Sequence, residues 1–476
     1  MIPLPANPDR PVAVFGLGKS GLATAAALMR SGIAVWAWDD GEGARAQAAA
    51  MGARLVELHG CDWSRPVSLV LSPGIPHTHP APHPVAAAAK AHGVEIIGDT
   101  ELFARALAER CVPPAACIGV TGTNGKSTTT ALIGHVLAQA GRPVAAGGNL
   151  GTPVLAFEPL PEDGVYAIEL SSYQLELTHS LACRAAVLLN VTPDHLGRHG
   201  GIEGYVAAKT RIFRNQGRQD TAIVGVEDAH CRAVHDRLVA AGRQKVVAIS
   251  TLEPLAGGVH AVGGRLVDDA TGAPRLVLDL AEAPALPGAH NWQNAAAAYA
   301  AARAVGVAPD VIAEGLRSFP GLAHRQELVA TIDGIRYVND SKATNADATA
   351  RALACYDPIY WIVGGQPKET GLDGLDGFLP RIAHAFLIGE AEDAFARVLA
   401  GRTPLTRCGT LAAAVAAAHE MAQREGRPGA VVLLSPACAS FDQFANFEAR
   451  GDAFRRLVQA LKPGAAAGGK IRRAAS

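Results

Sequence analysis

The stretch that decides the fold is IGVTGTNGKSTTTALIGHV, residues 118–136. A short apolar run leads into glycines and a lysine, and the residues after the lysine are typical of a helix. Gly122 and Gly125 allow backbone N–H groups to converge on phosphate oxygens, and Lys126 adds a positive charge there. The Ser127 hydroxyl is a suitable magnesium ligand. The usual G-x-x-x-x-G-K-[ST] spacing needs glycine at position 120, where valine stands, so a ligand-free helix start is the alternative interpretation; we favour a phosphate loop.

A second glycine-rich loop, GLGKSG, occupies residues 16–21 between the strand-like run VAVF and a helical stretch. It fits G-x-G-x-x-G, and the acidic pair Asp39 and Asp40 follows at about the ~20-residue distance of dinucleotide-binding folds. The backbone of such a loop approaches a pyrophosphate, which the N-terminus of the next helix stabilises. A nicotinamide dinucleotide, another nucleotide diphosphate and a purely structural turn all fit this pattern, and we favour the second.

Short β-branched runs alternate with alanine-rich helical stretches along nearly the whole chain. This alternation predicts the α/β class, with parallel sheets covered by helices. The composition of residues 251–287 instead predicts a small antiparallel excursion. We predict domains over residues 1–100, 101–320 and 321–462 and a disordered tail over 463–476. The segment SFPGLAHR, 318–325, is interpreted as a linker between the second and third domains, either passive or acting as a hinge.

The bulk composition limits the class of protein. The formal net charge is -1, so there is no global positive field and we expect no nucleic-acid partner. The eight cysteines are scattered, without zinc-ligand spacing, as is typical of buried thiols in a reducing cytosol. The N-terminus lacks a basic leader with an apolar stretch, and no apolar run approaches the ~20 residues that span a bilayer. We expect a cytoplasmic, soluble monomer without membrane insertion.

Further motifs extend the pattern from residue 16 to residue 455. In chain order they are GLGKSG, LSPGIP, GVTGTNGKSTTT, GGNLGTP, IELSSYQLE, LNVTPDHLGRHG, AAKTRIF, LPGAHNWQN, GLAHRQE, NDSKATN and LLSPACASFDQFANFEARGDAF. In content and order they resemble the Mur ligases and the related folylpolyglutamate synthetases. NDSKATN and SPACASFDQF are similar to the Mur ligases that add D-glutamate to UDP-N-acetylmuramoyl-L-alanine. The chain departs from the family pattern at Gly197, where Asp is common, and at Thr370, where Gly is common.

The resemblance implies a fold and a reaction. The implied fold has an N-terminal Rossmann-like domain for the UDP-substrate, a central P-loop ATPase-type domain, and a C-terminal Rossmann-like domain for the amino acid. The implied reaction uses ATP and Mg²⁺ to couple UDP-N-acetylmuramoyl-L-alanine to D-glutamate through an acyl phosphate, releasing ADP and phosphate, in peptidoglycan synthesis. Residue types alone do not distinguish D- from L-glutamate, because mirror images present the same charges.

Glu169 and His195 each follow a predicted strand, where open parallel sheets place ligands. The resemblance implies that they are catalytic together with Lys126 and Lys209, and that the metal ligands are Ser127, Glu169, His195 and Lys209, the last as a carbamate. The residues implied to bind ATP are Gly122, Thr123, Asn124, Gly125, Lys126, Ser127, Thr128, Asn291, Asn294, Arg325 and Asp340. Without the family, Lys209 would be a solvated helix lysine, and a lone histidine such as His195 would more often be structural.

The remaining implied residues bind the two building blocks. Those expected at the UDP-substrate are Lys19, Ser20, Asp39, Asp40, Ser72, Pro73, Gly74, Asn149, Ser171 and Ser172. The last three have loop capping as their alternative role. Those expected at the amino acid, a dianion that requires cations and hydrogen-bond donors, are Lys342, Thr344, Lys368, Ser440, Phe441 and Phe447.

Three other functions fit part of the pattern. GLGKSG alone is compatible with a nicotinamide oxidoreductase, which would change nicotinamide absorbance and release no ADP. A nucleotide-switched binding protein would bind ATP and a UDP-sugar without turnover. A folylpolyglutamate-type ligase would respond to a pteroyl substrate instead of the UDP-muramoyl one. The ATP-dependent ligase is the hypothesis that uses both glycine loops, the first to anchor a carrier nucleotide and the second to activate a carboxylate.

Overall fold

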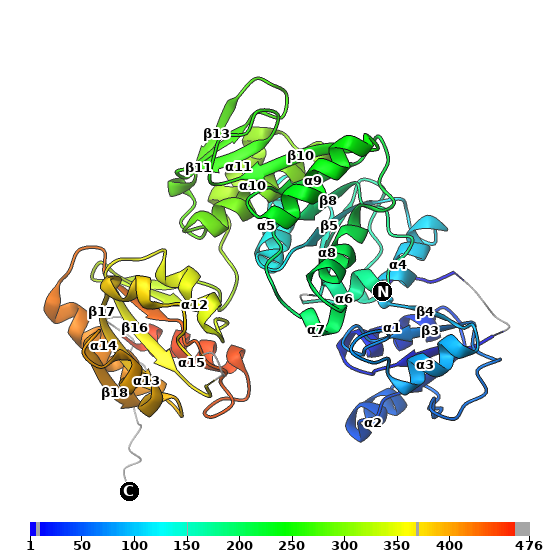
Figure 1. Cartoon of the computed structure of the whole chain (residues 1–476), viewed down its shortest axis with the longest axis horizontal. Helices are drawn as coiled ribbons and strands as arrows, with labels where there is room; N and C mark the ends of the chain where they lie inside the picture. Colours follow the sequence, from blue (N-terminus) through cyan, green and yellow to red (C-terminus); the bar gives the residue numbers. More distant parts are fainter. Residues whose placement is uncertain (6–9, 150, 368–370, 462–476) are drawn as a thin grey trace, which may run out of the picture. The chain divides into compact units, whose positions relative to one another are not determined.

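The computed structural model describes residues 1–5, 10–149, 151–367 and 371–461 (Figure 1). The chain forms two compact units. The first comprises Met1–Pro284 and Ala289–Phe319, and the second comprises Ala285–Gly288 and the chain from Pro320 onward. Three sheets with mainly parallel strands confirm the predicted α/β class. The boundaries predicted near residues 100 and 320 stay predictions, and the tail predicted over 463–476 lies outside the described residues.

The N-terminal sheet has four parallel strands in the order β2-β1-β3-β4. Its strands are β1 (Val12–Phe15), β2 (Val35–Trp38), β3 (Ser68–Leu71) and β4 (Glu95–Ile97), and its helices are α1 (Lys19–Arg30), α2 (Glu42–Ala50), α3 (Pro84–Ala91) and α4 (Asp99–Ala108). Alternate residues of β1 enter different cores: Val12 and Val14 join one cluster and Ala13 and Phe15 the other. This alternation buries both faces of the sheet, as expected where helices cover parallel strands.

The central sheet has nine strands in the order β13-β12-β11-β10-β9-β8-β5-β7-β6. Its strands are β5 (Ala116–Thr121), β6 (Val144–Gly148), β7 (Val165–Glu169), β8 (Ala185–Leu188), β9 (Thr221–Gly225), β10 (Lys245–Ser250), β11 (Val259–Val262), β12 (Arg265–Asp268) and β13 (Arg275–Asp279). The antiparallel pairs β11–β12 and β12–β13 confirm the predicted antiparallel excursion. Because β5 lies between β7 and β8, the segments that follow these three parallel strands meet at one edge of the sheet.

The helices of the central region are α5 (Lys126–Gln139), α6 (Ser172–Glu176), α7 (Leu196–His199), α8 (Ile202–Thr210), α9 (Ala229–Ala241), α10 (Ala289–Ala304) and α11 (Pro309–Arg317). Helices α5, α10 and α11 pack against one another beside the sheet (Figure 1). The alanines of α10 from 295 to 298 are fully buried, and such small side chains allow helices to approach closely. This packing places the start of α10 next to the start of α5.

The second unit contains a six-stranded sheet in the order β14-β15-β19-β16-β17-β18, in which only β14 is antiparallel to its neighbour. Its strands are β14 (Glu327–Ile332), β15 (Ile335–Asn339), β16 (Ile359–Gly364), β17 (Ile382–Ile388), β18 (Leu405–Gly409) and β19 (Val431–Leu434), and its helices are α12 (Ala346–Leu353), α13 (Glu392–Leu399), α14 (Leu411–Glu425) and α15 (Phe447–Ala460). Along β16, Ile359, Trp361 and Val363 enter one core, and Tyr360 and Ile362 enter the other. Within the described residues, no helix is long and apolar enough to cross a bilayer.

Candidate active site

The loop between β5 and α5 has the backbone conformation of an anion site. Gly122 and Gly125 have φ values of 151° and 87°, which L side chains rarely adopt. A Cβ atom on Gly125 would lie 2.3 Å from Asn294 Oδ1, so only glycine fits there. The Lys126 ammonium donates hydrogen bonds to the carbonyl oxygens of Gly122 (3.0 Å) and Thr123 (2.9 Å). The backbone amides at the start of α5 and this cation together favour a bound polyanion.

Asn190, the second residue after β8, holds this loop in place. Its Oδ1 accepts from the Asn124 amide (2.9 Å), its Nδ2 donates to Gln293 Oε1 (3.0 Å), and its carbonyl oxygen accepts from the Thr123 amide (2.8 Å). The sequence interpretation missed this residue. The available signal was a polar side chain after a buried strand, in LLNVTPDH, at the sheet edge that carries the phosphate loop.

Two asparagines of α10 support the loop from its buried side. Asn294 Oδ1 accepts from Thr129 Oγ1 (3.1 Å), and its Nδ2 donates to Asn291 Oδ1 (3.2 Å). Both asparagines are buried, and Ser127 is buried in the first turn of α5, where half-buried Thr128 follows it. The described contacts give Asn294 a role in positioning the loop. Contact of either asparagine with the base or ribose of ATP stays a prediction.

Glu169 ends β7 beside the phosphate loop and is only 2% exposed. Its Oε1 accepts from Asn149 Nδ2 (2.8 Å), whereas its Oε2 is buried without a hydrogen-bond partner among the described residues. Leaving a buried carboxylate oxygen unpaired is costly, and a divalent cation would satisfy it. The residues at this edge therefore fit a Mg²⁺ ion. Glu169, a predicted metal ligand, and Asn149, a residue predicted at the UDP-substrate, are thus in direct contact.

Lys209 lies on α8 and is 1% exposed, so the interpretation as a solvated helix lysine is wrong. Its ammonium donates to the Gly122 carbonyl oxygen (2.7 Å) and lies 4.4 Å from the centre of the Tyr205 ring. Burial, assisted by the positive charge of Lys126, lowers the pKa of Lys209 to about 7. A substantial fraction of this amine is therefore uncharged near neutral pH, as reaction with carbon dioxide requires.

His195 precedes α7 in the left-handed region, with φ of 52°. Its side chain is half-exposed, its Nε2 lies 3.4 Å from Asp194 Oδ2, and its ring centre lies 5.2 Å from that of Tyr173. The segment that carries it follows a strand, β8, as the sequence predicted, and β8 lies next to β5. Its role as a metal ligand stays a prediction.

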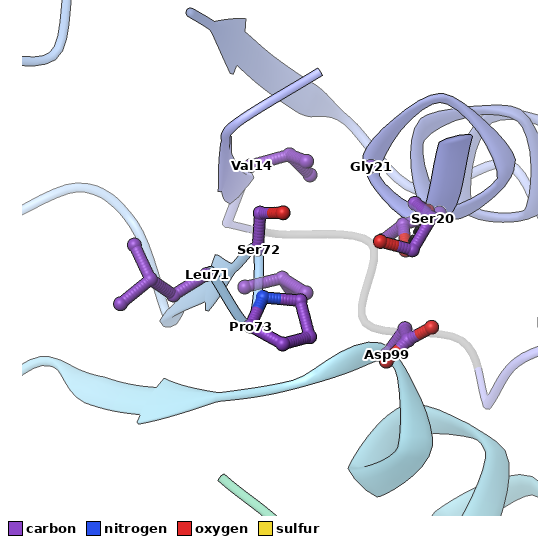
Figure 2. Close-up of a pocket in the computed structure, with 9 residues that line it drawn as sticks. Val14, Ser20, Gly21, Leu71, Ser72, Pro73 and Asp99 are labelled. Atoms are coloured by element: carbon purple, nitrogen blue, oxygen red, sulfur yellow. Dashed lines mark hydrogen bonds between the residues drawn. The ribbon is translucent and has the colours of Figure 1, made fainter. Parts of the chain in front are cut away.

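The first glycine loop lies beside a small pocket at the carboxyl ends of β1 and β3. Ser20, Ser72 and Pro73, three residues predicted at the UDP-substrate, line this pocket together with buried Asp99 (Figure 2). Exposed Gly74 follows Pro73. The structure thus brings together residues more than 50 positions apart in the sequence, as expected where parallel strands end side by side.

Two other residues predicted at the UDP-substrate brace the loop. The Asp39 carboxylate accepts from the Leu17 amide (2.6 Å) and the Gly41 amide (2.7 Å). Lys19 begins α1, and its ammonium donates to the Gly151 carbonyl oxygen (2.5 Å). These contacts hold the glycine loop next to the second strand and Gly151.

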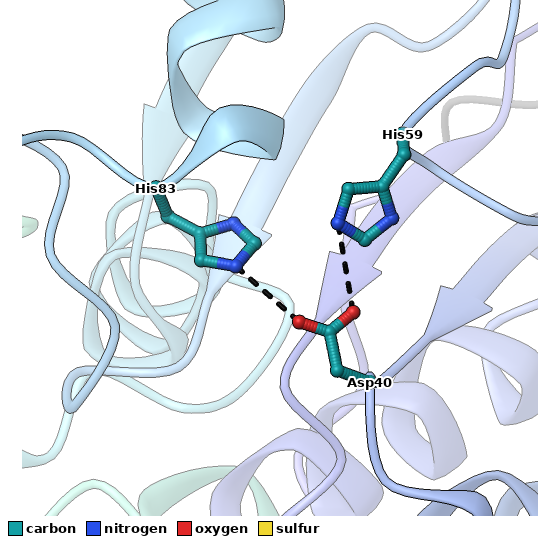
Figure 3. Close-up of side chains that lie close together, drawn as sticks. All are labelled: Asp40, His59 and His83. Carbon is teal, nitrogen blue, oxygen red and sulfur yellow. Dashed lines mark ion pairs between the residues drawn. The ribbon is translucent and has the colours of Figure 1, made fainter.

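Asp40 forms a cluster with two histidines, His59 and His83 (Figure 3). The Nε2 atoms of His59 and His83 lie 3.6 Å and 3.4 Å from its two carboxylate oxygens. However, His83 Nδ1 accepts a hydrogen bond from the Val85 amide (3.3 Å) at the start of α3. Neutral His83 therefore carries its proton on Nε2, which makes that atom a donor to Asp40 and a poor metal ligand.

The segment IELSSYQLE has two serines with different roles. Ser171 caps α6, because its Oγ accepts from the Gln174 amide (3.2 Å) and Gln174 Oε1 accepts from the Ser171 amide (3.0 Å). This is the capping role left open for it by the sequence. Ser172 is buried, and its Oγ lies 2.9 Å from His199 Nε2.

Five of the six residues predicted at the amino acid are among the described residues. Lys342 and Thr344 come after β15, and Ser440, Phe441 and Phe447 come after its neighbour β19. Lys342 Nζ lies 3.8 Å from the centre of the Phe447 ring; Ser440 is buried and Phe441 is 68% exposed. Thr344 is half-buried, and its amide donates to the Lys342 carbonyl oxygen (2.9 Å). Lys368 lies outside the described residues, as does Thr370.

Arg450, which the sequence interpretation missed, ties these two segments together. It is 1% exposed, and its guanidinium donates to Ser341 Oγ (3.0 Å) and to the carbonyl oxygens of Ser341 (2.9 Å), Ala439 (3.1 Å) and Cys438 (3.1 Å). Burial lowers the pKa of Arg450 to about 10. Its signal in the sequence was an arginine on the helix face shared by Phe447 and Phe454, where an apolar residue is expected.

Asp340 and Arg325, both predicted at ATP, belong to the second unit. Asp340 is buried; its carboxylate accepts from Ser435 Oγ (2.8 Å) and the Gln326 amide (3.2 Å). Burial raises the pKa of Asp340 to about 7. Arg325 is half-buried, next to Gln326. The nucleotide site predicted from residues of both units stays a prediction.

Comparison with known proteins gives two family matches. The Mur ligase middle domain matches residues 120–302, and the glutamate ligase domain of Mur ligases matches residues 324–438. The UDP-N-acetylmuramoylalanine--D-glutamate ligase of Paramagnetospirillum magneticum is 56% identical over 467 residues, covering 98% of this chain and 100% of the relative. The protein of the same name from Rhodospirillum rubrum is 55% identical over 466 residues, covering 97% of each chain.

Solved structures agree in fold. UDP-N-acetylmuramate-alanine ligase MurC from Thermotoga maritima superposes with a TM-score of 0.56 at 18% identity, covering 95% of this chain and 100% of that one. A UDP-N-acetylmuramoylalanyl-D-glutamyl-2,6-diaminopimelate--D-alanyl-D-alanyl ligase from Acinetobacter baumannii gives 0.55 at 21% identity, covering 77% and 81%. The two family matches and the full-length relatives show that this chain belongs to the Mur ligase family.

Proposed function

We propose that this protein couples D-glutamate to UDP-N-acetylmuramoyl-L-alanine in an ATP-dependent, amide-forming reaction of peptidoglycan synthesis. The relatives that share more than half of its residues carry the name of that ligase. The observation that carries the proposal is the phosphate loop with Lys126, bordered by the buried amine of Lys209 and by Glu169, which has one buried oxygen without a partner among the described residues. We place the reaction in the cytoplasm and the enzyme in a monomeric state.

The chemical problem is to turn a carboxylate oxygen into a leaving group. In our proposal, the carboxylate of the L-alanyl end attacks the γ-phosphorus of ATP, ADP departs, and an acyl phosphate results. The amine of D-glutamate then attacks the acyl carbon, so that the C–O bond breaks and phosphate leaves with the former carboxylate oxygen. Lys126 and the amides at the start of α5 counter the charge that gathers on the transferred group.

Magnesium fits the chemistry of this edge of the sheet. Glu169, Ser127, His195 and carbamylated Lys209 would hold it. When bound, it would neutralise the triphosphate and favour attack by the carboxylate. Asn149, hydrogen-bonded to Glu169, would fix that carboxylate and reach the L-alanyl end of the substrate.

The other two binding regions supply anchoring. Ser20, Ser72 and Pro73 around the N-terminal pocket would hold the UDP portion, with Asp39 and Lys19 fixing the loop and Asp40 reaching the uridine. In the second unit, Lys342 and Ser440 would bind the carboxylates of glutamate, with Phe447 as a wall of the pocket. Arg450, which donates hydrogen bonds to Ser341 and Cys438, would position the nearby Lys342 and Ser440.

The test is substrate-dependent release of ADP. Purified protein with ATP, magnesium and UDP-N-acetylmuramoyl-L-alanine should release ADP and phosphate when D-glutamate is added, and much less with L-glutamate. A pteroyl substrate and nicotinamide dinucleotides serve as the two comparison reactions. Release with the pteroyl substrate would identify a folylpolyglutamate-type ligase, and a change in nicotinamide absorbance would identify an oxidoreductase. Binding of both nucleotides without turnover would indicate a switch protein.

Gly125→Ala should weaken ATP binding by about tenfold or more. The added Cβ would meet Asn294 Oδ1 at 2.3 Å, and a side chain in the left-handed region costs ~1 to 2 kcal/mol. The matched control is Gly141→Ala at the end of the same helix, where φ is also positive, 70°, but the added Cβ meets nothing within 4 Å. ATP affinity is measured by titration calorimetry. Equal losses of affinity in both variants would contradict the positioning role of Asn294.

Arg450→Lys should raise the KM for D-glutamate by about tenfold, since lysine cannot reproduce the forked donor geometry and leaves buried carbonyl oxygens unpaired. The matched control is Arg455→Lys on the same helix, at an ion pair with Glu327 that is partly exposed. Its glutamate KM should stay within about twofold, because exposed ion pairs contribute little. A lower unfolding temperature of Arg450→Lys with an unchanged glutamate KM would assign Arg450 to stability alone.

A further inference from the structure

A line of hydrogen bonds runs from the segment after β9 to the phosphate loop. Glu227 Oε2 accepts from Gln293 Nε2 (3.1 Å), and Gln293 Oε1 accepts from Asn190 Nδ2 (3.0 Å). Asn190 Oδ1 accepts from the backbone amide of Asn124 in the loop (2.9 Å), and its Nδ2 also donates to the Asn124 carbonyl oxygen (3.3 Å). Two side-chain amides thus connect a carboxylate after β9 with the loop that carries Lys126.

Gln293, the middle member of this line, is enclosed by the strands beneath it. Its side chain belongs to α10 and is buried, with 6% of the residue exposed. A Cβ atom on Gly225 would lie 3.2 Å from Gln293 Nε2 and 2.0 Å from the Leu189 carbonyl oxygen, so a glycine at the end of β9 leaves room for this amide. A buried primary amide needs partners for both its oxygen and its nitrogen. Asn190 supplies one and Glu227 the other.

The direction of the line is set at both of its ends. Thr251 donates to Glu227 Oε1 through its backbone amide (2.6 Å) and its hydroxyl (2.8 Å), so this oxygen is an acceptor. The other carboxylate oxygen also accepts, and it therefore requires the nitrogen of Gln293. The Gln293 oxygen then faces Asn190, whose nitrogen donates to it and whose oxygen receives the Asn124 amide. Every donor along the line meets an acceptor, which is the condition for a polar network to rigidify a structure.

We infer that Glu227 is a positioning residue for the phosphate loop, because it fixes Gln293 and, through Gln293, holds Asn190 against the backbone of Asn124. The inference rests on the proposed function, which assigns this loop to ATP. A loop whose amides are already oriented binds its ligand without paying for ordering on binding. Loss of the acceptor at position 227 should therefore weaken the binding of ATP and leave the binding of the UDP-substrate unchanged.

Glu227→Gln is the first test, because it keeps the shape of the side chain and turns one of its two acceptors into a donor. Thr251 still requires an acceptor, so the new amide nitrogen faces the Gln293 nitrogen. One mismatched contact then remains in the line, whichever way the amides turn. ATP binding, measured by calorimetry with magnesium and without the other two substrates, should weaken by about five- to tenfold, as for the loss of one hydrogen bond. The affinity for the UDP-substrate should stay within about twofold of wild type.

The second test exchanges the two residues by combining Glu227→Gln with Gln293→Glu. The amide now at position 227 donates to the carboxylate now at position 293, whose other oxygen accepts from Asn190, so every donor again meets an acceptor. ATP affinity should return to within about threefold of wild type. An exchange variant that binds ATP as weakly as Glu227→Gln would overturn the inference, since a residue that contacts ATP directly would not be rescued from position 293.

Hydrogen exchange gives a readout that does not depend on the stability of the exchange variant. The Asn124 amide donates to Asn190 in the wild type, so its exchange with solvent reports how firmly Asn190 is held. This amide should exchange faster in Glu227→Gln than in the wild type. An unchanged exchange rate would show that the substitution does not reach the loop, and would overturn the inference. Thermal unfolding of each variant identifies losses of affinity that come from misfolding.

Asp333→Asn is the matched control, because Asp333 Oδ2 accepts from Gln423 Nε2 (3.0 Å) in an exposed carboxylate–amide pair of the second unit. This variant should bind ATP like the wild type. Release of ADP by the wild type, together with an unchanged ATP affinity in Glu227→Gln, would overturn the inference and leave the proposed function intact. A wild type that neither binds ATP nor releases ADP would refute the proposed function itself.

Discussion

Lys126→Ala is expected to lower ADP release by about 100- to 1,000-fold while leaving the affinity for the UDP-substrate within about threefold of wild type. In the folded protein, this ammonium already lies over the phosphate loop, bonded to the carbonyl oxygens of Gly122 and Thr123. Without it, the charge that develops on the transferred phosphoryl group has no cation from the loop to balance it. In our proposal the UDP portion is anchored elsewhere, around Ser20 and Ser72, so its binding should persist.

The matched control is Lys245→Ala, which removes an exposed lysine from the start of β10 and should not change the rate. ADP release is measured by a coupled assay, and UDP-substrate binding by calorimetry in the absence of ATP. Equal losses of turnover and UDP-substrate affinity in Lys126→Ala would contradict the assignment of activation and anchoring to separate loops.

Lys209→Arg is expected to lower turnover by about 1,000-fold, comparable with the loss of a major electrostatic contributor at a reacting group. An arginine stays protonated and cannot accept carbon dioxide, so it places a cation where our proposal requires an anion. Removing dissolved carbon dioxide should lower the turnover of the wild type, and bicarbonate should restore it, whereas Lys209→Arg should not respond. Lys245→Arg, an exposed lysine replaced in the same way, should behave as the wild type.

The pH dependence of kcat gives a second measurement on Lys209. Its pKa is lowered to about 7, first by burial and then by Lys126, so the reactive free amine predominates above that pH. The carbamate is therefore expected to form above about pH 7, and kcat to fall as pH drops through that value. A kcat that is independent of both pH and bicarbonate would contradict the carbamate.

The sequence was sufficient for features that depend on local order. Glycines at 122 and 125 followed by Lys126 predict a loop and a helix start, and the apolar run before Glu169 predicts that this residue lies at a strand end. Both follow from short stretches whose backbone geometry is set by neighbouring residues. The α/β class and the antiparallel excursion followed in the same way from alternation along the chain.

Features set by distant contacts were beyond the sequence. Lys209 looked like a solvated lysine because nothing near it in the sequence shows that α8 lies against Gly122. Arg450 donates hydrogen bonds to backbone atoms more than ten residues away in the sequence. The Glu176–His199 hydrogen bond joins α6 and α7, which β8 separates in the sequence. Such partners are fixed only when the sheets assemble, so their residue types carry no sign of the pairing.

The most direct test of the account follows one oxygen atom. The L-alanyl carboxylate of the UDP-substrate is labelled with oxygen-18, and the phosphate released during turnover with ATP and D-glutamate is examined by mass spectrometry. If the carboxylate attacks the γ-phosphorus at the Lys126 loop, each phosphate carries one labelled oxygen, because the acyl C–O bond breaks when the amine attacks. Unlabelled phosphate released together with the amide product would contradict an acyl phosphate, and with it the role assigned to this loop.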